Sequence, residues 1–230
     1  MPALPRAICF DLDDTFWALQ PVLLRAESRM WGFLETEHPK LAALMTPNSV
    51  LDVRRALAAD HPDRAHDMTW LRTEALRRLA VHHGHEAIVG DRAFEVFIEA
   101  RNDVEFFADV KPALAQFAEK FRLATFSNGN ACVHRIGIGD FFELSLNAES
   151  VGYAKPHPAV FATLASRLGL HLGEILHVGD HPENDIAGAA AAGCRTAWVN
   201  RRALSWPSEL GAPPDFEVPD LAALSHQLCG

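Results

Sequence analysis

Acidic and polar residues follow several apolar runs of this 230-residue chain, in an order that suits phosphate transfer. Four short stretches carry them: Asp11-Leu-Asp-Asp-Thr15, Ser127-Asn-Gly129, Lys155-Pro156, and Gly179-Asp180 through Asp185. Carboxylates can supply a nucleophile and metal ligands, a hydroxyl with backbone amides can hold phosphoryl oxygens, and a lysine can balance the remaining charge. The set predicts magnesium-assisted phosphoryl transfer.

The first stretch holds two carboxylates separated by one residue, Asp11 and Asp13. An extended backbone directs both side chains to the same side, so one can act as nucleophile and the other as general acid and base. Taken alone, such a pair equally fits a solvated turn or a helix cap. Beside Asp14, Asp180 and Asp185, however, the two carboxylates would repel one another strongly. We therefore expect a hard cation, and magnesium is the natural choice.

The second and third stretches provide groups that bind anions. Ser127 and Asn128 follow an apolar run and offer a hydroxyl and backbone donors, although an ordinary Asn-Gly turn would look the same. Lys155 precedes Pro156, which keeps the lysine backbone extended. An isolated lysine is usually a surface residue. Here we expect Lys155 to contact a phosphoryl group and Asp11.

The last stretch joins a further apolar run to a helix that contains several alanines. Asp180 is an expected metal ligand. Asp185 has two interpretations that the sequence leaves open. It either caps the following helix or supports the metal site, through Lys155 or a metal-bound water.

These stretches need one scaffold to bring them together, and the pattern predicts a doubly wound parallel sheet. Short apolar runs alternate with helical patterns, and ligands of such α/β folds bind at the carboxyl edge of the sheet. The expected strands are Arg6–Leu12, Phe121–Phe126, Glu143–Leu146, Ile175–Val178, Thr196–Val199 and a short one near Phe216.

Residues 17–107 break this alternation, because they show long amphipathic helical patterns and no convincing strand. Prolines and a glycine divide the segment into about four helices, with Asp67 as an expected helix cap. The sequence therefore predicts an α/β catalytic core formed by residues 1–16 and 108–230, with an inserted helical domain over 17–107.

Composition excludes several classes of protein. A net charge of −9 argues against nucleic-acid binding, and no apolar run is long enough to span a membrane. The amino-terminal residues do not resemble a secretion signal, so we expect a cytoplasmic protein, monomeric or homodimeric. The four cysteines are scattered and are expected to be reduced.

Taken in order, the four stretches resemble the motifs of the haloacid dehalogenase-like superfamily, and the insert resembles its α-helical (C1) cap. The resemblance spans the whole predicted core, which would be Rossmann-like. The flanking stretches DLDDTFWALQPVLLRAE, SNGNA and GEILHVGD further resemble bacterial flavin mononucleotide phosphatases, a group that includes enzymes acting on 5-amino-6-(5-phosphoribitylamino)uracil. The implied activity is magnesium-dependent hydrolysis of a small phosphorylated metabolite, with FMN or a riboflavin-pathway phosphate as candidate substrates.

The resemblance also implies roles for individual residues. Asp11 would be the nucleophile that forms an aspartyl-phosphate, and Asp13 would protonate the leaving group and then activate water. Ser127, the Asn128 amide and Lys155 would hold the phosphoryl group. The implied magnesium ligands are Asp11, the backbone carbonyl of Asp13, and Asp180, with Asp185 as support.

Other interpretations remain at this stage. A phosphomutase or a sugar-phosphate phosphatase would share every core residue, whereas a receiver-like signalling module would accept phosphate without an early helical insert. The superfamily's carbon–halogen hydrolases lack an acid/base aspartate at the position of Asp13. The histidines at 82, 83 and 85 could indicate a transition-metal site, but they lie at an expected helix end, which also suits histidine. We expect Trp31 to pack in the insert, and Trp17 and Trp70 could pack there or face a ringed substrate.

Overall fold

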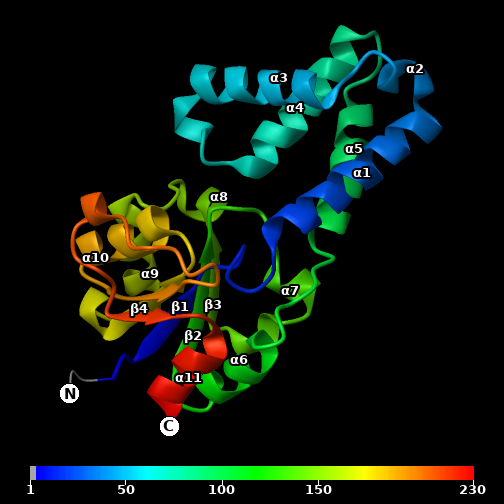
Figure 1. Ribbon diagram of the computed structural model, residues 1–230. Helices are drawn as coiled ribbons and strands as arrows, with labels where there is room; N and C mark the ends of the chain where they lie inside the picture. The colour runs from blue at the N-terminus through cyan, green and yellow to red at the C-terminus, as the bar shows by residue number, and fades with distance from the viewer. Residues whose placement is uncertain (1–3) are drawn as a thin grey trace. The chain divides into compact units, whose positions relative to one another are not determined.

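The computed structural model describes residues 4–230, so residues 1–3 of the expected core segment 1–16 lie outside the described part. A six-stranded parallel sheet in the order β3-β2-β1-β4-β5-β6 forms the centre of the fold (Figure 1). This confirms the predicted doubly wound α/β class. The strands are β1 (Ala7–Phe10), β2 (Arg122–Ser127), β3 (Leu144–Asn147), β4 (Ile175–Gly179), β5 (Arg195–Val199) and β6 (Phe216–Val218).

Strand β1 is buried along its whole length, because both faces of the sheet are covered. Ala7 and Cys9 pack with residues of α9 and α10 on one face. Phe10 points to the opposite face, where its ring lies 5.6 Å from that of Phe117 in α6. This is the alternation expected of a strand with one helical layer on each side.

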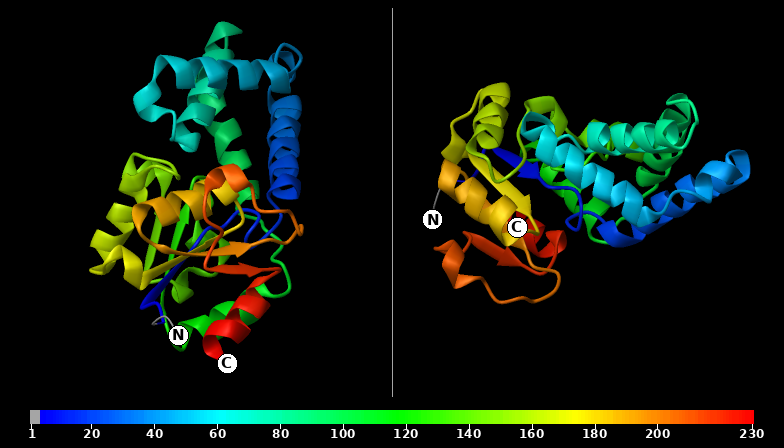
Figure 2. Two further views of the ribbon diagram at one scale, coloured as in Figure 1. Left: turned by 60° about the vertical axis from the view of Figure 1, so that its left-hand side comes forward. Right: turned by 90° about the horizontal axis from the view of Figure 1, so that it is seen from above.

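The helices of this α/β part are short and lie between consecutive strands, except α11, which follows the last strand. In Figure 2 the carboxyl-terminal helix α11 lies beside α6, and the two pack together. The α-helices are α6 (Val110–Ala118), α7 (Val133–Ile136), α8 (Ala148–Val151), α9 (Pro158–Leu168), α10 (Gly188–Ala192) and α11 (Leu221–Cys229). A π-helical turn, η4 (Pro182–Ala187), precedes α10, and 3-10 turns cover η2 (Gly139–Phe141), η3 (Leu172–Glu174) and η5 (Ser208–Leu210).

The inserted segment is helical, and its core is apolar. Helix α1 buries Val22, Ala26, Met30 and Leu34, which recur every four residues on one face. Asp67 caps α4 by accepting a hydrogen bond from the Trp70 amide at 2.8 Å, as predicted. The helices are α1 (Leu19–Glu37), α2 (Pro39–Ala42), α3 (Pro47–Asp60), α4 (Met68–His82) and α5 (Ile88–Arg101), with a 3-10 turn η1 (Pro62–Arg64).

The described chain divides into two compact units, a core unit (residues 4–18 and 105–230) and a helical unit (Leu19–Val104). The chain passes from one unit to the other after Ala18 and after Val104, within three residues of the expected ends of the insert, 17 and 107. In the core unit an isolated β-bridge between Trp17 and Phe106 joins the two segments of chain that lead into and out of the insert. No helix in residues 4–230 has the length and apolarity that crossing a bilayer requires.

Candidate active site

The predicted residues gather at the carboxyl ends of three adjacent strands, β2, β1 and β4. Asp11 and Asp13 follow β1, Ser127 is the last residue of β2, and Asp180 follows β4. Because parallel strands end at the same edge, residues more than 160 positions apart in sequence become neighbours here. The sheet topology therefore positions the site.

Lys155 is the central cation of this site and is only 4% exposed. Its Nζ donates hydrogen bonds to Asp11 Oδ1 at 2.6 Å, Asp185 Oδ1 at 2.6 Å and the Phe126 carbonyl at 3.0 Å. Burial alone would lower the pKa of Lys155, but the two carboxylates outweigh burial and raise it. The lysine is thus a fixed positive charge between two acids.

Three carboxylates lie beside this lysine. One oxygen from each of Asp11, Asp180 and Asp185 falls within 4.8 Å of the others. Burial raises the pKa of Asp11 well above its usual value, against the opposing effect of Lys155. Burial, with the charges of Asp185 and Asp14, raises the pKa of Asp180 to about 7. Two of the three acids therefore hold protons more readily than ordinary aspartates do.

This donor set fits a magnesium ion. The cluster contains hard oxygen ligands, and burial together with the neighbouring carboxylates raises the pKa of Asp11 and Asp180, an effect that a bound cation would oppose. Asp185 belongs to the cluster directly, whereas the sequence assigned it a supporting place. The Asp13 side chain is not part of this cluster, and the contribution of its backbone carbonyl stays a prediction. The described residues contain no second group of three such ligands, so the histidines at 82, 83 and 85 do not form one.

Asp185 is fixed on three sides. Its Oδ1 accepts from Lys155 and lies 3.1 Å from His177 Nε2, and its Oδ2 accepts from the His181 backbone amide at 3.0 Å. Burial would raise the pKa of Asp185, but Lys155 and the His177 hydrogen bond hold it below its usual value. The His181 side chain caps this helical turn through the Asn184 amide. Asp185 therefore both accepts a backbone hydrogen bond at the start of η4 and pairs with Lys155.

Asp13 is oriented by a tight loop. Asp14 adopts a left-handed backbone conformation, with φ of 57°, and its amide donates to the Trp17 carbonyl at 2.8 Å. The loop returns the Trp17 side chain to Asp13, whose Oδ1 accepts from Trp17 Nε1 at 2.9 Å. Trp17 is fully buried against Phe16 and Phe106, so it packs in the core unit and does not face a substrate.

Ser127 is buried, and its Oγ accepts a hydrogen bond from the Gly129 amide at 3.0 Å. The Asn128 side chain holds the backbone of Lys155 from both sides. The Lys155 amide donates to Asn128 Oδ1 at 2.8 Å, and Asn128 Nδ2 donates to the Lys155 carbonyl at 2.9 Å. The sequence predicted a role only for the Asn128 backbone amide. The structure shows that the Asn128 side chain also holds the backbone of Lys155 in place.

Two supporting residues were missed from sequence. His177 lies inside strand β4, fully buried, with its ring edge-on to Phe161. Burial lowers its pKa, so the ring is neutral and Nε2 can donate to Asp185. Trp198 in β5 donates from Nε1 to the Asp180 carbonyl at 2.7 Å. A histidine within an otherwise apolar strand was the one available signal, because a buried polar side chain needs a partner.

The remaining tryptophans lie in the helical unit. Trp31 and Trp70 are both partly buried against its apolar core, and the Trp31 placement confirms the prediction. The Trp70 ring also carries the Arg64 guanidinium at 4.2 Å and the edge of His61. Trp70 is therefore occupied by neighbours from its own unit.

Comparisons with known proteins agree with this geometry. The family of haloacid dehalogenase-like hydrolases matches residues 5–193. The chain is 32% identical to the 5-amino-6-(5-phospho-D-ribitylamino)uracil phosphatase YigB of Escherichia coli, over 95% of this chain and 94% of that protein. It is 28% identical to a glyceraldehyde 3-phosphate phosphatase of Methanopyrus kandleri, over 93% and 92% of the two chains. The crystal structure of a 2-haloacid dehalogenase from Pseudomonas syringae superimposes with a TM-score of 0.93, 34% identity and 98% coverage of both chains.

Proposed function

Because the chain belongs to the haloacid dehalogenase-like hydrolase family, we propose that it is a magnesium-dependent phosphatase that hydrolyses a small phosphorylated metabolite through an aspartyl-phosphate. The observation that supports this proposal is that Trp17 orients Asp13, whose charge acts on the buried Asp11 of the carboxylate cluster. A nucleophile and a proton donor stand together there. Phosphate-ester hydrolysis needs both.

In the first step Asp11 attacks phosphorus, and the bond between phosphorus and the ester oxygen breaks. Lys155 holds Asp11 Oδ1 and so orients the carboxylate for attack. Asp13 donates its proton to the departing alkoxide. Ser127, the Asn128 backbone amide and Lys155 hold the phosphoryl oxygens. Asp11, Asp180 and Asp185, with the Asp13 backbone carbonyl, would hold a magnesium ion, whose positive charge would offset the negative charge of the phosphoryl group.

In the second step Asp13, now a carboxylate, takes a proton from water, whose oxygen attacks phosphorus. The bond between phosphorus and Asp11 breaks, which restores the enzyme and releases inorganic phosphate. The Trp17 hydrogen bond keeps Asp13 oriented in both steps, because the indole N–H can donate to either form of the carboxyl group.

Dehalogenation is the second candidate, since a structurally similar relative with 34% identity is a 2-haloacid dehalogenase. In that reaction a carboxylate displaces halide from carbon, and halide leaves without a proton. A group such as Asp13 is then not needed as an acid. The presence of Asp13 therefore favours the phosphatase.

The riboflavin-pathway substrate is the preferred candidate, because YigB, which is 32% identical over nearly its whole length, is a phosphatase for that compound. FMN and sugar phosphates are the next candidates. A net charge of −9 is consistent with a small-molecule substrate and against nucleic acid.

The test is a substrate panel measured with magnesium: phosphoribitylaminouracil, FMN, sugar phosphates and p-nitrophenyl phosphate for phosphate release, and 2-chloropropionate for halide release. We expect many turnovers of phosphate per enzyme, loss of activity in Asp11→Asn and Asp13→Ala, and normal rates in the surface control Asp52→Asn. Halide release that survives Asp13→Ala would identify a dehalogenase. A single phosphate accepted per chain would identify a receiver-like module.

A further inference from the structure

The helical unit contains a cationic cluster that its own residues do not neutralise. The cluster comprises Arg54 of α3, Arg72 of α4 and Glu27 of α1. Arg72 donates to Glu27, and its guanidinium lies over the ring of Phe97 of α5 at 3.8 Å. Four helices of this unit therefore contribute to one place, where two arginines share one carboxylate.

Arg54 is the member without an oxygen partner. Its Nη2 reaches only the thioether sulfur of Met68, at 3.9 Å, and its buried Nε has no hydrogen-bond partner among the described residues. A guanidinium offers five N–H donors and stays charged at physiological pH. Arg54 is partly buried, and leaving its buried Nε without an acceptor is unfavourable, because buried donors are normally paired with oxygen acceptors.

The electrostatics agree with this geometry. Burial, followed by the positive charge of Arg72, lowers the pKa of Arg54 to about 10, and Glu27 opposes the shift only in part. The Arg72 side chain is 9% exposed, so water screens this repulsion weakly. With two cations and one anion, the cluster has a formal charge of +1.

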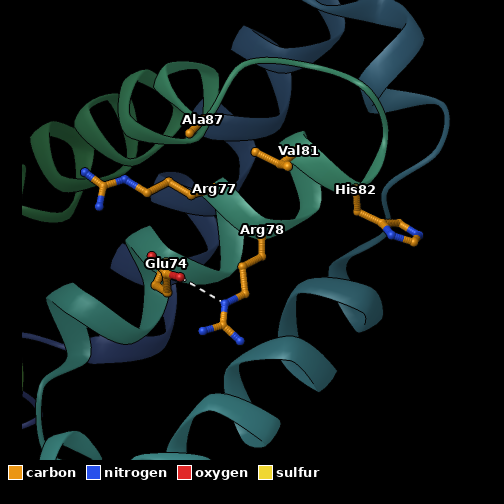
Figure 3. A pocket seen from close by; sticks show the side chains of 6 residues that line it. All are labelled: Glu74, Arg77, Arg78, Val81, His82 and Ala87. Atoms are coloured by element: carbon orange, nitrogen blue, oxygen red, sulfur yellow. Dashed lines mark hydrogen bonds and ion pairs between the residues drawn. The ribbon is translucent and has the colours of Figure 1, made fainter.

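Three other arginines of this unit differ from Arg54, because each has an acidic partner. Arg55, the next residue, is exposed and pairs with Asp52 at 3.6 Å. The groove in Figure 3 has a volume of about 400 Å³ and contains two more arginines of α4. There Arg78 pairs with Glu74 at 2.9 Å, as the dashed line shows, and Arg77 pairs with Asp91 at 2.6 Å. That groove is charge-balanced, whereas the Arg54 cluster is not.

We propose that Arg54 and Arg72 form a binding site for an oxyanion, a phosphate or carboxylate group, within the helical unit. The planar guanidinium of Arg54 suits bidentate contact with such a group. Arg72 adds charge and is already held in place by Glu27 and Phe97. An oxyanion would supply the oxygen acceptors that Arg54 lacks and neutralise the cluster.

The oxyanion has two possible sources. It is either a second anionic group on a substrate other than the riboflavin-pathway phosphate and FMN, which carry only their phosphate, in which case the inference rests on the proposed phosphatase function, or a free anion that binds independently of turnover. The two sources share the same contacts with Arg54. They differ in whether loss of Arg54 alters the kinetics of hydrolysis.

The direct test uses the full chain and inorganic sulfate at constant ionic strength, with sodium chloride as balance. The Nε–H signals of the arginines are followed by ¹H–¹⁵N NMR. We expect a saturable shift of the Arg54 signal, with no comparable shift of the Arg55 signal. This measurement needs no substitution and no enzymatic activity, so its outcome is separate from that of the proposed function. An Arg54 signal that moves no more than that of Arg55 overturns the site.

The source is identified with Arg54→Gln and the matched control Arg55→Gln. Two substrates are compared: p-nitrophenyl phosphate, which has no second anionic group, and 2-phosphoglycolate, which has a carboxylate. A loss of tenfold or more in kcat/KM for 2-phosphoglycolate alone, in Arg54→Gln alone, identifies the substrate's own anion. Unchanged kinetics with both substrates, together with the sulfate shift in the native protein, identifies a free oxyanion. Equal losses in both variants contradict the proposal.

Discussion

Replacing Lys155 by methionine gives the most direct test of the charge arrangement at the sheet edge. Methionine has a similar length but no charge, so the substitution removes the ammonium group without leaving a large void. Asp11 and Asp185 then lose their shared donor, and each is buried. We expect the metal-free protein to lose stability and the enzyme to lose turnover.

The magnitude follows from the separation of the acids. Oxygens of Asp11 and Asp185 lie within 4.8 Å of each other. Two unit charges at this distance repel by about 3.5 kcal/mol at an effective dielectric constant of about 20. Breaking a buried ion pair by removing one partner typically costs about 3–5 kcal/mol. We therefore expect the free energy of unfolding to fall by about 3 kcal/mol in EDTA at pH 8.

Protonation sets the pH dependence of this loss. Without Lys155 the folded variant can relieve the repulsion by binding a proton on Asp11, whose pKa is already raised by burial. The folded state then binds more protons than the unfolded state above about pH 4, the ordinary pKa of an aspartate, so the variant becomes less stable as pH rises toward the raised pKa of Asp11. The deficit should be smaller at pH 5 than at pH 8.

Urea unfolding in EDTA, followed by tryptophan fluorescence, measures these values. Lys40→Met is the control, because Lys40 is exposed and its loss should change the unfolding free energy by less than about 0.5 kcal/mol. Added magnesium should stabilise Lys155→Met more than it stabilises the native protein. If Lys155→Met and Lys40→Met have equal stability in EDTA at pH 8, the reasoning about this buried pair is refuted.

Two further predictions concern neighbouring contacts. A Cβ added at Gly179 would lie 2.3 Å from Asp185 Cγ, so Gly179→Ala should lower kcat at least tenfold, whereas Gly173→Ala, whose nearest contact is at 3.9 Å, should keep the native rate. Equal rates in the two variants would contradict the close packing of Asp185. Partial burial would raise the pKa of Asp109, but hydrogen bonds from Arg201 and the Leu221 amide hold it below its usual value. Its contribution to stability is therefore present above about pH 4 and lost as pH falls through the lowered pKa, so acid unfolding curves of Asp109→Asn should lack this loss.

The sequence was sufficient for the sheet and for the residues at its edge. Apolar runs such as the one containing Cys9 have few alternatives to a buried strand once helical patterns flank them. Parallel pairing then brings the residues after β1, β2 and β4 to one edge. The chemistry of Asp11 and Lys155 could be anticipated because residue type and order already restrict it.

The supporting contacts could not be predicted in the same way. Trp198 reaches the Asp180 carbonyl only because β5 lies beside β4, whereas His177 reaches Asp185 only because the chain turns back through η4, eight residues later. Strand order depends on the packing of the whole unit and leaves no local pattern in the sequence. The Asn128 side chain is a similar case, since its partner is the backbone of Lys155, 27 residues away.

Charge balance links the two candidate sites. At the sheet edge Asp11, Asp180 and Asp185 face one lysine, which gives a formal charge of −2. In the helical unit two arginines face Glu27, which gives +1. Elsewhere in the helical unit arginines such as Arg77 are matched by an acid. Because unbalanced charge at buried or partly buried positions is unfavourable in the folded protein, its presence in each unit is best explained by a ligand that completes the balance, a divalent cation in the core unit and an oxyanion in the helical unit.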